Sequence, residues 1–313
     1  MKMKKEKKRE GFINRVKLSF KRDWQLYILI LPTLIYLIIF NFMPMYGLQI
    51  AFKDFHPAKG FANSEWAGFK YFMKFFNNYQ FWPIMRNTLV LGVYSLVAGF
   101  FPPIILALLL HNTASKKFKS LVQTISYAPH FISVVVMAGM IILMLSPSAG
   151  VINTIITMLG GTKVSFMSDP ELFPHIYVWS GVWQGMGWGS IIYMSALAGA
   201  DPELYDAAKV DGASKLQRIL HLDIATITPT AIIMLIMNCG SILNSNTQKV
   251  LLMQNNLNIS ASEIIGTYVH KSGILNRQYS YSSAIGLFQT IINVIMLLSV
   301  NKISGKVSET SLW

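Results

Sequence analysis

The residues best suited to binding chemistry in this sequence are amides and hydroxyls at the end of an apolar run. Four of them, Asn238, Ser241, Asn244 and Ser245, lie close together. Asparagine offers both donors and acceptors and therefore suits the hydroxyl groups of a sugar. Spacings of three and four place Asn238, Ser241 and Ser245 near one face of a helix. These side chains either line a path for a polar solute or form hydrogen bonds between helices, which are common in membrane bundles.

The sequence shows no cluster of residues that would favour covalent chemistry beside these amides and hydroxyls. Cys239 is the one cysteine, and it lies in an apolar stretch, so no disulfide framework or cysteine-based metal site is expected. His130, His175 and His221 lie apart from one another. The phosphate-binding pattern G-x-x-x-x-G-K-[ST] is missing, so the chain is not expected to cradle ATP by that route. The sequence predicts a non-catalytic protein without a metal site.

A second group of polar residues forms a small, charged loop at about 199–225, between two long apolar stretches. Asp201 and Pro202 predict a helix start, because aspartate caps free amides and proline is favoured at the first helical position. Glu203 then lies in the first turn, where it complements the helix dipole. Gly212 predicts the end of this helix, because glycine adopts a left-handed conformation without strain.

The predicted helix carries one narrow face of small residues. Leu204, Ala207, Ala208 and Asp211 fall on neighbouring positions at spacings of three and four. A second helix is expected from about 214 to 222. The loop therefore predicts a helix–Gly–helix elbow whose smooth face another surface can approach closely. An inert connector would explain the Asp-Gly turn, but not the length of the loop.

The elements that must position both groups are membrane-spanning helices. Of the 313 residues, 53% are hydrophobic and 13% are charged, whereas soluble domains carry about 25% charged residues. A spanning helix needs about 20 predominantly apolar residues. Six segments qualify, and none contains Asp, Glu, Lys or Arg: 27–46, 87–110, 121–145, 176–198, 227–243 and 283–300. The first follows a basic arm but is too long for a signal peptide, so it is expected to remain as a span.

Basic residues predict the orientation of these spans. Eighteen of the 27 lysines and arginines fall in the N-terminal arm, the 111–120 loop, the 199–225 loop and the C-terminal tail, which six spans place on one side. The positive-inside rule assigns that side to the cytoplasm. The net charge of +13 is therefore interpreted as orientation and contact with anionic lipid, not as nucleic-acid binding. The predicted organisation is a cytoplasmic arm (1–26), one six-helix membrane domain (27–300) and a cytoplasmic tail (301–313).

Several segments of the sequence resemble those of a known protein family. "DAAKVDGA" is similar to the cytoplasmic loop motif of permease subunits in binding-protein-dependent ABC importers, which reads Glu-Ala-Ala, three residues, Gly, nine residues, then Ile-x-Leu-Pro. Ala225 stands where the motif has proline, and 246–248 read Asn-Thr-Gln where the family pattern has Gly-Phe-Glu. "LPTLIYLIIFNFMPMYGLQIAFKDF", "GMGWGSIIYMSALAGADPELYDAAKVDGA" and "QYSYSSAIGLFQT…SLW" resemble the permeases that import complex carbohydrates.

The resemblance implies an all-α integral membrane protein of the type I importer fold, with six spans and both termini in the bacterial cytoplasm. It implies assembly with a second permease subunit, a cytoplasmic ATPase pair that holds ATP and Mg, and an extracytoplasmic sugar-binding lipoprotein. It further implies that the loop helix docks on the ATPase. The residues expected to form this contact are Glu203, Leu204, Asp206, Ala207, Ala208, Asp211, Gly212 and Ala213.

Two alternatives stay open from the sequence. One is an ABC permease for a solute other than a sugar, because spacing alone does not reveal sugar specificity. The other is a secondary transporter, although such proteins use ionisable groups inside the membrane and the six predicted spans contain no acid.

Overall fold

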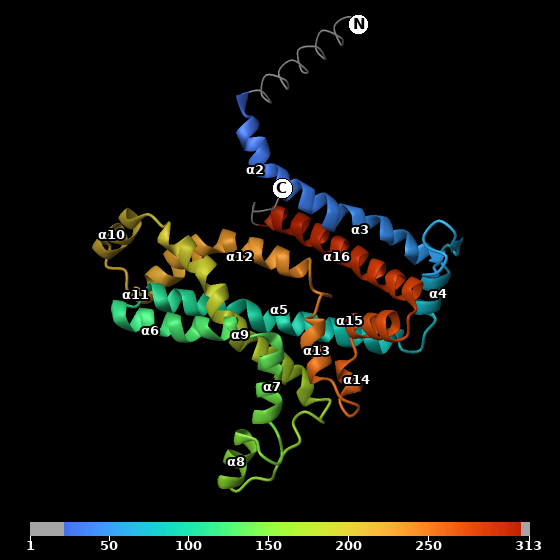
Figure 1. The fold of residues 1–313 in the computed structure, drawn as a ribbon. Helices are drawn as coiled ribbons and strands as arrows, with labels where there is room; N and C mark the ends of the chain where they lie inside the picture. Colours follow the sequence, from blue (N-terminus) through green and yellow to red (C-terminus); the bar gives the residue numbers. More distant parts are fainter. Residues whose placement is uncertain (1–21, 308–313) are drawn as a thin grey trace, which may run out of the picture. The chain divides into compact units, whose positions relative to one another are not determined.

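The computed structural model describes residues 22–307 and divides into two compact units, Met1–Gly68 and Phe69–Trp313. Most of the predicted basic arm, 1–26, and the end of the predicted tail, 301–313, lie outside the described residues. Figure 1 shows a largely helical chain. The predicted helical class is confirmed, apart from one small two-stranded sheet in the first unit.

The first unit contains one long apolar helix and a hairpin. The helix comprises α2 (Trp24–Leu37), a π-helical turn (Ile38–Phe42), α3 (Met43–Met45) and a 3-10 segment (Tyr46–Phe52). The π turn ends two residues before Pro44, which has no backbone N–H to donate to the preceding turn. The antiparallel strands β1 (Lys53–Asp54) and β2 (Glu65–Trp66) follow. The prediction of a helix over 27–46 is therefore confirmed.

The second unit is built around a pair of long helices. α5 (Phe81–His111) and α9 (Leu172–Ala198) pack along each other over much of their length. Leu91 and Ala107 of α5 and Phe173 and Leu197 of α9 are fully buried in this interface or at its ends. α12 (Ile224–Cys239) and α16 (Tyr279–Val307) pack against each other, and α12 also contacts α5 and α9.

Shorter elements complete the second unit, and they connect or cover the long helices. They are α4 (Lys70–Phe76), α6 (Lys116–Tyr127), a 3-10 turn (Ala128–Phe131), α7 (Val134–Met144), α8 (Val151–Met158), α10 (Pro202–Val210), α11 (Lys215–Arg218), a π turn (Ile219–Asp223), α13 (Thr247–Met253), α14 (Ile259–Ser262), α15 (Ile265–His270) and a second π turn (Lys271–Leu275). The short helix α4 lies in the aromatic segment that follows the hairpin.

The predicted third span, 121–145, consists of two helices that meet at a sharp bend. α6 and α7 meet at a bend of 100°, and α7 projects sharply away from α6 in Figure 1. Pro129 lies in the 3-10 turn that ends the first helix, since proline cannot continue the hydrogen-bond ladder. Ser133 then caps the new helix by accepting a hydrogen bond from the amide of Val136.

The predicted boundaries of the fifth span, 227–243, are wrong. Its helix begins well before them, at Lys215, and runs through the π turn to Cys239. Gly240 follows as the C-cap, and the residues from Gly240 to Asn246 are not helical. Asn244 and Ser245 therefore lie in a connecting segment.

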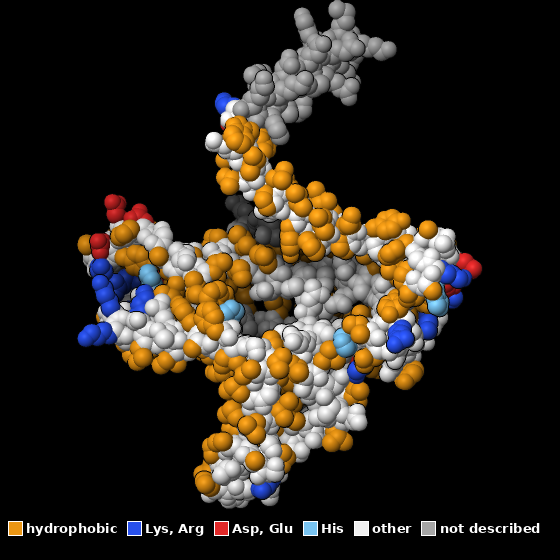
Figure 2. All heavy atoms as spheres, viewed as in Figure 1, with side chains coloured by type: hydrophobic (Ala, Val, Ile, Leu, Met, Phe, Trp, Pro, Cys, Tyr) orange, Lys and Arg blue, Asp and Glu red, His pale blue; other side chains and the backbone are white. Residues whose placement is uncertain are grey.

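Four helices within residues 22–307 are long and apolar enough to cross a membrane: Trp24–Phe52, Phe81–His111, Lys215–Cys239 and Tyr279–Lys306. The bent pair Lys116–Phe131 and Val134–Met144 raises this to five if it forms one broken span. α9 covers the predicted fourth span and is long enough to cross a membrane. Its glycines and polar residues lower its hydropathy, and it is not one of these four helices. In the second unit, charged side chains gather over α10, α11 and the start of α6, and apolar side chains dominate the helices beside them (Figure 2).

Candidate functional site

The 199–225 loop forms the predicted helix–Gly–helix elbow. Asp201 caps α10, with its carboxylate accepting a hydrogen bond from the amide of Glu203 at 2.9 Å. Pro202 occupies the first helical position. At the other end, Gly212 has φ of +75°. Ser214 caps α11 in a reciprocal arrangement with Gln217.

The helix end at Gly212 has the hydrogen-bond pattern of a Schellman motif. The amide of Ala213 donates to the carbonyl of Ala208 at 2.8 Å, and the amide of Gly212 donates to that of Lys209 at 3.1 Å. This pattern requires a left-handed residue at Gly212. A Cβ built there would meet no atom within 4 Å. The only local restriction on a side chain at this position is therefore the backbone conformation.

α10 presents an unpartnered surface on this chain. None of its residues is buried. Glu203, Leu204, Asp206, Ala207, Asp211 and Gly212 are exposed, whereas Ala208 and Ala213 are half-buried. Asp206 pairs with Lys209 at 2.8 Å across one helical turn, and this contact lowers the pKa of the Asp206 carboxyl. The predicted face thus combines small residues with the exposed apolar side chain of Leu204.

A buried carboxylate joins the elbow to the long helices. Asp223 has no exposed surface. It accepts a hydrogen bond from the Tyr205 hydroxyl of α10 at 2.6 Å and another from the Asn112 amide at the end of α5, also at 2.6 Å. Burial and the neighbouring carboxylate raise the pKa of Tyr205 to about 12, so its hydroxyl stays protonated and donates. One side chain therefore connects α10, α5 and the helix that leads into α12.

The four polar residues predicted from the sequence surround one cavity. Asn238, Ser241, Asn244 and Ser245 line a space of about 330 Å³ together with parts of α5 and α9. It adjoins a second space of about 380 Å³, and the two share Ser95, Gly99, Tyr177, Asn238 and Asn246 in their walls.

Some of these four residues also form hydrogen bonds within the protein. The Asn244 side-chain oxygen accepts hydrogen bonds from Gln289 and Asn293 of α16, each at 2.9 Å. Ser241 donates to backbone carbonyls of its own helix end. Asn238 is exposed and lines both spaces. The two interpretations made from the sequence thus apply to different atoms: Asn244 ties this segment to α16, and Asn238 faces the cavity.

A buried lysine lies at the wall of the second space. Lys249 in α13 is 4% exposed. Its Nζ donates to the backbone carbonyl of Tyr177 at 2.6 Å and lies 4.6 Å from the centre of the Tyr177 ring. Burial lowers the pKa of the Lys249 ammonium to about 8.

Glycines on α9 let neighbouring backbones approach. A Cβ at Gly187 would lie 1.9 Å from the carbonyl oxygen of Ser126, so α6 and α9 touch through backbone here. A Cβ at Gly189 would lie 3.3 Å from Pro103 of α5. Gly185 would meet nothing within 4 Å and lines the cavity instead. Gly187 and Gly189 therefore allow α6 and α5 to pack closely against α9.

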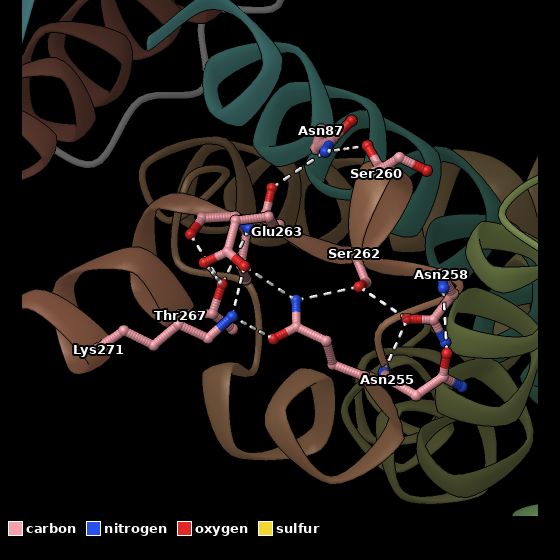
Figure 3. Close-up of polar contacts among 10 residues, drawn as sticks. Asn87, Asn255, Asn258, Ser260, Ser262, Glu263, Thr267 and Lys271 are labelled. Atoms are coloured by element: carbon pink, nitrogen blue, oxygen red, sulfur yellow. Dashed lines mark hydrogen bonds and ion pairs between the residues drawn. The ribbon is translucent and has the colours of Figure 1, made fainter. Parts of the chain in front are cut away.

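A polar network braces the opposite end of α5 (Figure 3). Lys271 pairs with Glu263 at 2.5 Å and also donates to Gln254 at 2.8 Å. The Thr267 hydroxyl donates to Glu263, and the Asn87 amide at the start of α5 donates to the carbonyl of Glu263. The network fixes α14, α15 and the adjoining turn against α5.

Residues 99–309 match the family described as binding-protein-dependent transport system inner membrane component. This range contains the elbow, Asp223 and the cavity-lining part of α12. The chain belongs to this transport family.

Relatives of this transport protein are similar over nearly its whole length. LplB of Bacillus subtilis is 41% identical, with 94% of this chain and 93% of the relative covered. The polygalacturonan/rhamnogalacturonan transport system permease YteP of the same organism is 36% identical, with 99% and 95% covered. A subunit in the crystal structure of a bacterial ABC transporter involved in the import of the acidic polysaccharide alginate superposes with a TM-score of 0.87, at 37% identity, with 94% and 99% covered.

The structure of this transport protein contains functional candidates that the sequence analysis missed. In the sequence, Asp223 falls on a variable position of the loop motif, and Lys249 lies outside the six predicted spans. The partners of Asp223, Tyr205 and Asn112, lie 18 and 111 residues away in sequence. The partner of Lys249 lies 72 residues away. A charged residue beside an apolar run was the only local signal for either position.

Proposed function

We propose that this chain is the membrane-spanning permease subunit of an ABC importer. It translocates a carbohydrate, in our proposal an oligosaccharide, that an extracytoplasmic binding protein delivers. ATP hydrolysis on a separate ATPase subunit drives the movement. The chain itself performs no covalent chemistry.

The observation that carries this proposal is the connection between the elbow and the cavity. Tyr205 of α10 donates to Asp223, and Asn112 at the end of α5 donates to the same carboxylate. α5 supplies Ser95 and Gly99 to the cavity walls, and α12 continues from Asp223 to Asn238. A displacement of α10 therefore acts on two helices that line the cavity. A switch of this kind needs a contiguous element that both sites bias, and this junction supplies one.

The exposed face of α10 supports its assignment as the ATPase contact. We assign this contact to Glu203, Leu204, Asp206, Ala207, Ala208, Asp211, Gly212 and Ala213. Small side chains permit close approach, and Leu204 offers an apolar anchor that this chain leaves exposed. ATP and Mg are held by the ATPase partner in this proposal, and this chain binds no cofactor.

The cavity supports a carbohydrate as the solute. Its walls combine amide, hydroxyl and phenol groups with apolar surface, a composition that suits a ring with many hydroxyls. We assign Asn238, Ser241, Asn244 and Ser245 to the substrate path. The names of the relatives, which refer to polygalacturonan, rhamnogalacturonan and alginate, favour a carbohydrate over other solutes.

For the topology we propose six spans with both termini in the cytoplasm of a bacterial cell. Residues 1–26 form the basic arm, 27–300 the membrane domain with its coupling loop at about 199–225, and 301–313 the tail. The α6–α7 pair then counts as one broken span, and α9 as a span despite its lower hydropathy. α9 is protected from lipid along the face that packs on α5, so it does not need to be apolar all round.

The proposed partners are a second permease subunit, an ATPase dimer, the binding lipoprotein and membrane lipid, without nucleic acid. The family description, binding-protein-dependent transport, supports the delivery of substrate by a separate protein.

The proposal is tested by purifying the tagged chain from its host and identifying the proteins that co-purify. The complex is then reconstituted in liposomes, and ATP-dependent uptake of labelled oligosaccharides is measured with binding protein present. We expect a second permease, an ATPase and sugar-stimulated ATP hydrolysis. Uptake that needs an ion gradient but no ATP would favour the secondary transporter, and stimulation by peptides or polyamines alone would favour a permease for another solute.

A further inference from the structure

Lys249 is the only charged side chain in the walls of the two adjoining spaces, within the part of the chain that the structure describes. The remaining lining consists of backbone, apolar groups and neutral polar groups. A solute in this cavity would therefore meet one fixed cation and no fixed anion. This distribution of charge favours an anionic solute, because a carboxylate in the cavity meets a cation and no like charge on the walls.

The surroundings of Lys249 compensate its charge only in part. An ammonium group has three donors, and the structure gives Nζ one hydrogen-bond acceptor, the carbonyl of Tyr177. The Tyr177 ring adds a cation–π contact. Among residues 22–307, no carboxylate forms an ion pair with Lys249. Burying a charge without a counter-charge is costly, so a counter-charge from a ligand would be favourable here.

The backbone next to Lys249 is shaped to leave the ammonium room. Gly181 lies one helical turn after Tyr177 on α9, and a Cβ at Gly181 would lie 3.3 Å from Nζ. Gly181 and Lys249 both line the same space. Asn246, which caps α13 by accepting from the Lys249 amide, lines it as well. The lysine is thus held at a wall of the cavity by an element with fixed geometry.

We propose that Lys249 binds the carboxylate groups of an acidic oligosaccharide, one built from uronic acid units, as it passes through the cavity. The inference rests on the proposed function and names its substrate class. Amides and hydroxyls such as Asn238 and Ser241 would bind the neutral hydroxyls, and Lys249 would hold one carboxylate at a time. A single cation suits translocation, because binding must be strong enough for entry and weak enough for release.

A structural role is the competing explanation, since Lys249 also ties α13 to α9 through the Tyr177 carbonyl. Three variants separate the two roles. Lys249→Gln keeps a hydrogen-bond donor but loses the charge, Lys249→Arg keeps the charge, and Lys249→Met loses both. If Lys249→Met fails to assemble, the Gln and Arg variants still decide.

The test uses the whole complex in lipid nanodiscs, without the binding protein, so that selection by that protein does not enter. Two fluorescent probes are titrated: an oligogalacturonate and the same oligosaccharide with its carboxyls reduced to alcohols. We expect the Gln and Met variants to bind the acidic probe about tenfold or more weakly, since hydrogen bonds to charged groups are the stronger class. The Arg variant should stay within about threefold of the wild type, and all variants should bind the neutral probe equally.

Equal weakening for both probes in Lys249→Gln would overturn the proposal and assign Lys249 a bracing role. Unchanged binding of both probes would overturn it as well. Failure of the proposed function looks different: the wild-type complex would then bind neither probe and, with binding protein added, would import no oligosaccharide.

Discussion

Asp223 brings one carboxylate to the junction of three helical elements. It accepts hydrogen bonds from Tyr205 and Asn112 while it lies fully buried. Hydrogen bonds to a charged group contribute about 1.5–3 kcal/mol each, more than neutral ones. The π turn Ile219–Asp223 ends at this residue, and such turns are frequent at functional positions. Asp223 is therefore the residue at which we expect elbow and cavity to be coupled.

Replacing Asp223 should uncouple ATP hydrolysis from transport. Asp223→Leu removes the acceptor of the Tyr205 hydroxyl and one of the two acceptors of the Asn112 amide, which keeps the Leu108 carbonyl. Each unsatisfied donor costs roughly 1–3 kcal/mol. We expect an assembled complex whose sugar-stimulated ATPase activity and uptake fall by roughly tenfold or more. Asp223→Asn keeps one carbonyl oxygen as an acceptor and should lie between Leu and wild type. Full coupling in the Leu variant would show that the junction is only a packing contact.

The charge on Lys249 predicts a dependence on pH. Its pKa is lowered to about 8, so the ammonium is mostly charged at pH 7 and is lost as the pH rises through about 8. The two residues that contact Lys249, Tyr177 and Asn246, are not acidic and do not provide a counter-charge. Binding of the acidic probe should therefore weaken between about pH 7 and 9, and binding of the neutral probe should not. In Lys249→Arg the acidic probe should bind with little change over this range; a matching decline in that variant would assign the effect to another group.

At the residue scale, the sequence was informative where chemistry is local. Amides and hydroxyls within eight residues, from Asn238 to Ser245, could be predicted to act together, and they share one cavity. The assumed helical face was nevertheless wrong, because the helix ends at Cys239 and Ser241 and Ser245 lie in the non-helical segment that follows. Lys249 and Asp223 could not be predicted, because their partners come from segments far away in sequence.

At the scale of elements, the elbow was predictable because its signals are local. The cap at Asp201, the proline after it and the left-handed Gly212 each act over a few residues. A kink at Pro129 could be expected from the sequence, but the sharp bend between α6 and α7 could not. Proline is tolerated within membrane helices, as Pro102 and Pro103 in α5 show, so its presence alone does not decide between a kink and a break.

Gly212 should be essential for the geometry of the elbow. A β-branched residue in its left-handed conformation is strained by about 1–2 kcal/mol. Gly212→Val should therefore tilt α10 and reduce ATPase association or stimulation, and Ala208→Arg should act at the same face by steric exclusion. Gly212→Asn is the matched control, because asparagine tolerates this conformation and no atom lies within 4 Å of a Cβ there. Co-purification and ATPase assays measure the effect; normal coupling in both disruptive variants would return the loop to an inert connector.

The α6–α9 contact allows a stability test with an internal control. Gly187→Ala places a Cβ 1.9 Å from the Ser126 carbonyl oxygen, and overpacking of this kind costs about 1–3 kcal/mol. Gly185→Ala, half a turn away, meets no atom within 4 Å. We expect the first variant to lower the thermal unfolding temperature of the purified complex and the second to leave it unchanged. Equal unfolding temperatures for the two variants would mean that α6 and α9 can move apart without a loss of stability.

At the scale of the whole molecule, composition alone predicted a helical membrane protein, because a deficit of charge is visible without any structure. The number of spans was harder to predict. α9 is shielded by α5 and is less apolar than a lipid-exposed helix, and the α6–α7 pair is broken. Hydropathy measures how apolar a segment is. A spanning helix that other helices cover can contain glycines and polar residues, so a hydropathy threshold misses it.

The structure sharpens the test of the proposed orientation. Cys239 is buried and is replaced by serine in the background. Lys117→Cys at the start of α6 and Val210→Cys at the end of α10 carry exposed side chains, and both should be protected from a membrane-impermeant thiol reagent in intact cells. Asn63→Cys in the hairpin segment and Lys163→Cys after α8 are also exposed and should react. Ser64 is unsuitable because it is 5% exposed and donates to the carbonyl of Gly60.

Permeabilised cells provide the control for this labelling, since all four cysteines should react once both faces are open. The expected pattern follows from the basic residues, which gather at the α6 and α10–α11 end of the second unit and would face the cytoplasm. That end also carries the exposed face of α10, so the same side must hold the ATPase. A reversed pattern would place the elbow outside the cell, away from ATP, and the proposed coupling could not operate. A mixed pattern, with Lys163 protected like Lys117, would instead mean that the broken α6–α7 pair re-enters on the same side and that the chain has fewer than six spans.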